Sequence, residues 1–155
     1  MEVWVHSQRR KYELIFYRVL IRQNCHYLLS HSAFRSKFRL SYADRTYAET
    51  RNDELLKKHA KEILHDRIGS ANPKNDGKQT PYKGHPIFTA QHATGCCCRG
   101  CLYKWHGIDK GRELTEEELN TLSDVILEWI HRDLQKPTPK KRVRKGETLD
   151  LFDQD

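Results

Sequence analysis

Apolar residues recur at helical spacing in two parts of the chain and predict its two longest helices. The first runs from residue 53 to residue 68, with Gly69 as its stop. The second opens at Thr115 and continues to about residue 134. Their apolar positions are Leu56, Ala60, Ile63 and Leu64 in the first, and Leu119, Leu122, Ile126, Trp129 and Ile130 in the second. Both stripes are predicted to form the core.

Local start and stop signals add two shorter helices. Ser41 and Asp44 resemble a capping box and predict a helix over 42–50, as Thr115 and Glu118 do for the last helix. Residues 97–105 are also expected to be helical, with Gly107 ending that segment. The chain is therefore predicted to be mainly α-helical.

Residues 70–94 lack periodicity and are rich in turn residues, which predicts a long polar loop. Long irregular loops in small domains are usually functional or disordered. Lys74, Lys78 and Lys83 could receive phosphate there, although a merely solvated loop is the more common outcome for such a composition.

Both ends differ from the middle. We expect an N-terminal extension over 1–31, whose apolar run is broken by arginines and which could reflect a start codon placed too far upstream. A helical Cys/His domain is predicted over 32–136. From residue 137 to residue 155, proline and clustered charge predict a disordered tail that opens with a basic run. The basic side chains of that run are Lys140, Lys141, Arg142, Arg144 and Lys145.

Charge and cysteine content narrow the class of protein. The net charge is +7, and residues 1–70 carry 14 basic against 8 acidic side chains, which suits a phosphate backbone or another acidic partner. No apolar run approaches the roughly 18 residues of a membrane span. No secretory signal is evident. The cysteines are odd in number, and four of the five are clustered, which favours a reducing cytoplasm over a disulfide framework.

Four of the five cysteines lie between two histidines in HATGCCCRGCLYKWH, residues 92–106. Thiolate and imidazole are the ligands that zinc prefers. Cys98 and Cys101 form a C-x-x-C pair that one turn can present to one ion, with His92 and His106 completing a first quartet. Cys97 competes for a place, because on a helix it lies one turn from Cys101. An iron–sulfur cluster is disfavoured by so few spaced thiols.

Other chemistry stays open at this cluster. Buried cysteines can act simply as small apolar residues. A Cys beside a His could be an activated nucleophile, or a zinc with an open position could activate water. Asp76 and Glu113 are then candidate bases by proximity in sequence alone, so catalytic residues are not assigned.

Five sequence blocks between about Ser32 and Leu134 resemble a bacterial family known as domain of unknown function 4186. They are FRSKFRL at 34–40, PKNDGKQTP at 73–81, GHPIFTAQHAT at 84–94, CCRGCLYKWHGI at 97–108 and KGRELTEEE at 110–118. The resemblance implies a small, mostly helical cytosolic domain and no particular activity. Its thiol pattern is C-C-x-x-C, which matches Cys97, Cys98 and Cys101 and makes Cys96 incidental.

The end of the tail resembles a second motif. Residues 148–152 are similar to the bacterial sliding-clamp-binding pentapeptide, with Thr148 where glutamine is usual. The resemblance implies that Leu149, Asp150, Leu151 and Phe152 contact the clamp.

Together these features predict a small zinc-binding protein of DNA metabolism, tethered to the replication clamp by its tail. Phosphate would be held by the lysines of the 74–83 loop and by the 140–145 run. A nucleic-acid repair or processing enzyme, and an interaction module with a purely structural zinc, are the alternatives.

Overall fold

The computed structural model describes residues 27–75 and 77–141 of the 155-residue chain. Within these ranges the chain is helical and contains no strand, so the prediction of a mainly α fold is confirmed. The elements are the 3-10 helix η1 (Arg35–Lys37) and the α-helices α2 (Tyr42–Glu49), α3 (Asp53–Ile68), α4 (Pro86–Ala93), α5 (Arg99–His106) and α6 (Glu116–Leu134). None of the helices in the described part is long and apolar enough to cross a membrane.

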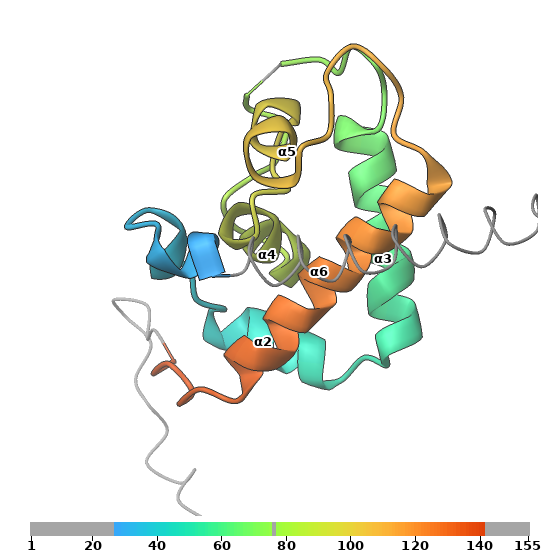
Figure 1. Cartoon of the computed structure of the whole chain (residues 1–155). Helices are drawn as coiled ribbons and strands as arrows, with labels where there is room; N and C mark the ends of the chain where they lie inside the picture. The colour runs from blue at the N-terminus through green and yellow to red at the C-terminus, as the bar shows by residue number, and fades with distance from the viewer. Residues whose placement is uncertain (1–26, 76, 142–155) are drawn as a thin grey trace, which may run out of the picture.

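Helix α6 crosses the middle of the domain, with α3 packed along it and α4 against another part of its surface (Figure 1). The two apolar stripes predicted from the sequence meet here. On α3, Leu56, Ala60 and Leu64 are at most 1% exposed, and α6 contributes Leu119, Leu122, Ile126 and Ile130 to the same cluster. Ile63 and Trp129 pack against its edge. Burial of these side chains is the main source of stability.

The helix starts follow the capping signals of the sequence. The Ser41 hydroxyl accepts the backbone N–H of Asp44 at the start of α2. At α6, Thr115 and Glu118 form a complete capping box, and Arg112 donates to both carboxylate oxygens of Glu118 at 2.9 and 2.6 Å. The Arg112 guanidinium holds the pKa of Glu118 below its ordinary value. Helices α2 and α6 therefore begin where their capping residues predict.

The prediction of a long loop over 70–94 is wrong for Pro86–Ala93, because these residues form helix α4. Seven of its eight residues are buried. A helix enclosed on nearly every side has no polar face, so its sequence shows no amphipathic period. The usual N-terminal signals are also weak, since His85 takes the capping position and Pro86 the first turn. Among the described residues, the irregular loop is therefore confined to 70–75 and 77–84.

His85 should make the fold sensitive to acid. Its Nδ1 accepts the backbone N–H of Ile87, so the cap needs a neutral ring, and burial, followed by the nearby His59, lowers the pKa of His85. A lowered folded-state pKa means that the unfolded chain takes up the proton first, near its ordinary pKa of about 6.5. Stability is therefore present above that pH and is lost as pH falls through the folded-state value.

We expect urea unfolding to give a lower free energy of unfolding at pH 5.5 than at pH 7.5 in the wild type. The difference between the two pH values should be smaller in His85→Asn. Asparagine caps a helix but does not titrate in this range. Equal losses in the two proteins would assign the acid sensitivity to other groups, of which His92 is one because burial lowers its pKa as well.

A sharp turn carries the chain from α4 into α5. Gly95 has φ +70°, and a Cβ there would lie 2.9 Å from the Trp105 ring, so only glycine fits. Gly107 ends α5 in the left-handed conformation, as the sequence predicts. Between these glycines, Arg99 is 2% exposed and donates to the backbone carbonyls of Ile68, Ser70 and Asp109. Arg99 thereby fixes the start of α5 to the end of α3.

Candidate metal centre

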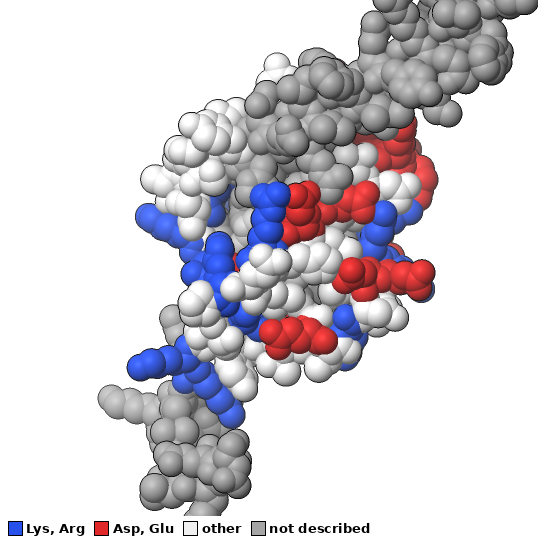
Figure 2. All heavy atoms as spheres, turned by 60° about the horizontal axis from the view of Figure 1, so that its bottom comes forward, with Lys and Arg blue, Asp and Glu red and all other residues white. Residues whose placement is uncertain are grey.

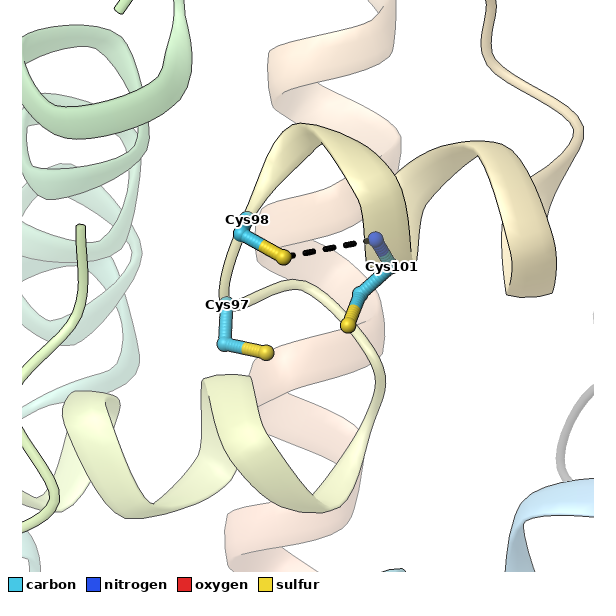
Figure 3. Close-up of side chains that lie close together, drawn as sticks. All are labelled: Cys97, Cys98 and Cys101. Atoms are coloured by element: carbon cyan, nitrogen blue, oxygen red, sulfur yellow. Dashed lines mark hydrogen bonds between the residues drawn. The ribbon is translucent and has the colours of Figure 1, made fainter. Parts of the chain in front are cut away.

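Three cysteine side chains converge where the turn after α4 enters α5 (Figure 3). The Sγ atoms of Cys97, Cys98 and Cys101 all lie within 4.8 Å of one another. Cys97 and Cys98 are buried, and Cys101 is partly exposed. Among the described residues these three form the group of His, Cys, Asp and Glu side chains able to hold a metal ion together.

Local backbone structure sets this arrangement. Cys98 is the N-cap of α5, and its sulfur accepts the backbone N–H of Cys101 at 3.4 Å, drawn as the dashed line in Figure 3. Cys101 is in the first turn of the helix and points back toward the cap. The carbonyl of Cys97 accepts a hydrogen bond of 2.8 Å from the buried Thr80 hydroxyl, which ties the turn to the loop before α4.

Arg35 of η1 provides a cation at the sulfurs. Its guanidinium donates to Cys101 Sγ at 3.0 Å and to Cys97 Sγ at 3.6 Å, and it also donates to the backbone carbonyl of His92. Arg35 is 7% exposed. This contact was missed in the sequence, because the arginine lies more than 60 residues before the cysteines and nothing local marks it.

The cysteines differ in how readily they ionise. The hydrogen bond from Cys101 holds the pKa of Cys97 below its ordinary value, and Arg35 lowers it further. The same hydrogen bond raises the pKa of Cys101, and burial raises that of Cys98. Cys97 is therefore the first of the three to become a thiolate, the form that binds metals.

The two histidines of the predicted ligand set are used elsewhere. His92, in α4, directs Nε2 at the carbonyls of Thr80 and Pro81, at 3.1 and 3.2 Å. His106, the last residue of α5, directs Nε2 at the Thr94 carbonyl at 2.7 Å. Carbonyl oxygens only accept, so both Nε2 atoms carry the proton and donate. Within the described chain, neither histidine is brought into the cysteine group.

Cys96 lies apart from the other three thiols. It is fully buried, and its Sγ contacts the Thr94 carbonyl at 3.6 Å and His106 Nε2 at 3.5 Å. Burial raises its pKa to about 12. Cys96 therefore behaves as a small core residue and provides a natural control for the cluster.

The donor set fits a thiophilic metal ion. Neighbouring sulfurs around a tetrahedral zinc, with Zn–S of about 2.3 Å, lie about 3.8 Å apart. Sulfurs already within 4.8 Å need only small side-chain adjustments to reach that spacing. Three thiolates around a divalent ion leave one negative charge, which the buried Arg35 guanidinium can balance.

The other predicted site residues are dispersed or fall outside the described ranges. Lys74, Lys78 and Lys83 are exposed in the loop before α4, and Lys140 and Lys141 are exposed after α6. Glu113 is exposed in the turn before α6. Outside the described residues lie Asp76, Arg142, Arg144, Lys145, Thr148, Leu149, Asp150, Leu151 and Phe152.

Comparison with known proteins gives one family assignment. The model of the family described as Domain of unknown function (DUF4186) matches residues 23–131, more than half of the chain. This range contains every described helix except the last three residues of α6, and it includes the cysteine cluster. No solved structure matches the chain.

Proposed function

The chain belongs to the DUF4186 family, and from its cysteine cluster we propose that it is a zinc-binding protein of DNA metabolism. The convergence of Cys97, Cys98 and Cys101 within 4.8 Å carries the zinc-binding part of this proposal. Three buried or half-buried thiols with a guanidinium beside them form a donor set suited to a soft or borderline ion. Zinc is preferred because it tolerates a tetrahedral site built mainly from sulfur.

Bound zinc would join the turn before α5 to the first turn of that helix. Thr80 and Arg35 extend this connection to the polar loop and to η1, through the Cys97 carbonyl and the cysteine sulfurs. The site would then hold three segments that are distant in sequence. Bound zinc would thereby restrict the motion of the loop before α4, in which Lys74, Lys78 and Lys83 lie.

The zinc proposal predicts about one zinc per chain in full-length protein purified under reducing conditions without chelators. Cys98→Ser and Cys101→Ser should each lose most of it, because two thiolates bind zinc far more weakly than three. Cys96→Ala should keep its zinc, since that sulfur faces Thr94 and His106. Elemental analysis of the four proteins, with circular dichroism as a check of folding, decides the matter. Metal-free wild type would refute the zinc proposal.

DNA is the proposed partner because basic side chains gather near the end of α6. Arg39 and Lys136 both pair with the buried Asp133, and Arg39 also donates to the Pro137 carbonyl where the tail begins. Lys140 and Lys141 follow. Figure 2 shows Lys and Arg concentrated toward this side of the molecule and Asp and Glu toward the other. Such a surface would contact phosphates, and its affinity would fall with salt.

The sliding-clamp tether is proposed from the sequence of residues 148–152. Deletion of residues 147–155 should abolish binding to a purified bacterial sliding clamp in a pull-down, and alanine at Leu151 and Phe152 should do the same, because these side chains would fill the apolar pocket. Alanine at Lys140 and Lys141, outside the motif, is the matched control. Unchanged clamp binding after the deletion would exclude the tether and leave the zinc proposal intact.

An enzyme that processes nucleic acid is the second candidate, and the number of thiols favours it. Three protein ligands leave one coordination position of zinc open, as in catalytic sites, whereas structural sites usually have four. Removal of the metal with a chelator separates the two roles. A protein that stays folded but no longer processes nucleic acid indicates a catalytic ion, whereas loss of folding indicates a structural one.

A further inference from the structure

We propose that the aromatic surface beside the cysteine cluster binds single-stranded nucleic acid by stacking an unpaired base on Tyr82. Lysines of the segments that form this surface would hold the adjoining phosphates. They are Lys37, Lys83 and Lys104, all exposed. This inference rests on the proposed role in DNA metabolism and narrows its substrate to strands with unpaired bases.

Three rings under this surface lie nearly parallel. The Tyr82 ring stacks on His92 with a centroid distance of 4.1 Å and an interplanar angle of 7°, and Phe38 is stacked against His92 at 5.5 Å and 12°. Hydrogen bonds from His92 to the carbonyls of Thr80 and Pro81 fix the orientation of the His92 ring. The orientation of the Tyr82 ring is therefore fixed by its contact with the buried His92 ring.

The outer part of this stack is open. Tyr82 lies on His92, and Phe38 is nearly parallel to it, with a centroid distance of 6.3 Å and an interplanar angle of 9°. Tyr82 is nevertheless 60% exposed, so much of this residue remains open to solvent. Phe34, 50% exposed, meets Phe38 edge to face at 5.2 Å. Flat, fixed, exposed rings are the platforms on which proteins stack unpaired bases, and the interaction tolerates any base because each has a π-face.

The two chain segments that form the platform carry basic side chains and no acidic ones. Residues 27–43 and 77–108, which supply η1, the 78–84 loop, α4 and α5, contain no Asp or Glu. Lys37 directly precedes Phe38, Lys83 directly follows Tyr82, and the Lys104 ammonium lies 5.2 Å from the Trp105 ring. A polyanion can therefore follow these segments without meeting a carboxylate from either of them.

Arg35 connects the platform to the cysteine cluster. Its guanidinium lies over the Phe34 ring at 5.4 Å and the Trp105 ring at 5.7 Å while it donates to the sulfurs of Cys97 and Cys101. The metal site and the aromatic surface thus share one side chain.

Duplex DNA does not suit such a surface. Its bases are already stacked on their neighbours, so an aromatic ring outside the helix meets sugars, phosphates and base edges but no free base face. An unpaired strand offers a free base face and a phosphate on each side of it. Stacking and charge therefore both favour the single strand.

Fluorescence anisotropy with the full-length protein tests the inference. The probes are an oligothymidylate and an oligouridylate of about 15 nucleotides each, and a DNA duplex of the same length, at one fixed salt concentration. We expect both single strands to bind more tightly than the duplex, and their ranking to show whether DNA or RNA is preferred. Tyr82→Ala should weaken single-strand binding about tenfold, as expected for one stacked base. Tyr82→Phe should bind like the wild type.

Tyr42→Ala, which removes an exposed tyrosine at the start of α2, should also bind like the wild type. Tighter binding to the duplex, or wild-type affinity in Tyr82→Ala, would overturn the inference while leaving DNA binding in place. Failure of the wild type to bind any of the three probes would instead remove the proposed nucleic-acid function itself. Circular dichroism of each variant separates a lost contact from a lost fold.

Discussion

Replacement of Arg99 by methionine is expected to lower the free energy of unfolding by at least about 3 kcal/mol. The side chain is 2% exposed and donates to three backbone carbonyls, those of Ile68, Ser70 and Asp109, at 3.2, 3.2 and 2.6 Å. Methionine fills much of the volume, but it leaves the carbonyl of the buried Ile68 unsatisfied and removes the two charge-assisted hydrogen bonds to the carbonyls of the exposed residues Ser70 and Asp109. Each buried polar group left unsatisfied costs about 1–3 kcal/mol.

Urea unfolding monitored by circular dichroism measures this cost. Arg132→Met is the matched control, because Arg132 is exposed on α6 and pairs with Glu128 on the same helix. That change should fall within about 0.5 kcal/mol of the wild type. Similar losses in the two variants would show that the three carbonyl contacts of Arg99 contribute little. Arg99→Lys should not restore stability, since one ammonium cannot reproduce the planar fork of the guanidinium.

Removal of the Asp133 carboxylate is expected to have the second largest effect, about 3 kcal/mol for Asp133→Ala. Asp133 is 1% exposed, and its Oδ2 accepts the buried backbone N–H of Leu40 at 2.9 Å. Its Oδ1 pairs with Arg39 at 2.8 Å and Lys136 at 3.3 Å. Truncation to alanine would leave the Leu40 N–H without an acceptor, and it would remove the counter-ion of Arg39 and Lys136.

Asp124→Ala on the same helix is the control for this prediction. Asp124 also forms an ion pair, with Lys57 at 2.6 Å, but both side chains are more than a third exposed. Exposed pairs contribute about 0–1 kcal/mol. Chemical denaturation of the two variants should therefore separate them by about 2 kcal/mol, and equal losses would contradict the importance assigned to burial.

Periodic apolar stripes and capping residues predicted α3 and α6 well, because both helices are half exposed and show their period. Helix α4 could not be found this way, since a helix buried on nearly all sides has no polar positions to define a face. Asp133 and Arg99 also escaped notice. Charged residues near a helix end or in a turn usually face water, and only the packing shows that these two are buried.

The cysteine part of the site was predictable from spacing alone, and the histidine part was not. Spacing shows that Cys98 and Cys101 can share one turn and that Cys97 competes for a place one helical turn from Cys101, and the structure brings all three together. His92 and His106 are also close to the cysteines in sequence, but their Nε2–H groups donate hydrogen bonds to backbone carbonyls. Arg35 approaches from a segment far away in the chain, and a contact of that kind depends on the tertiary fold.

X-ray absorption at the zinc edge of the purified full-length protein tests the proposed zinc site, because it reports the number and type of ligand atoms. We expect three sulfurs at about 2.3 Å and one lighter atom. They would come from Cys97, Cys98 and Cys101, with the fourth position open to solvent or substrate. A first shell with two sulfurs and two imidazole nitrogens, or with no sulfur, would contradict it.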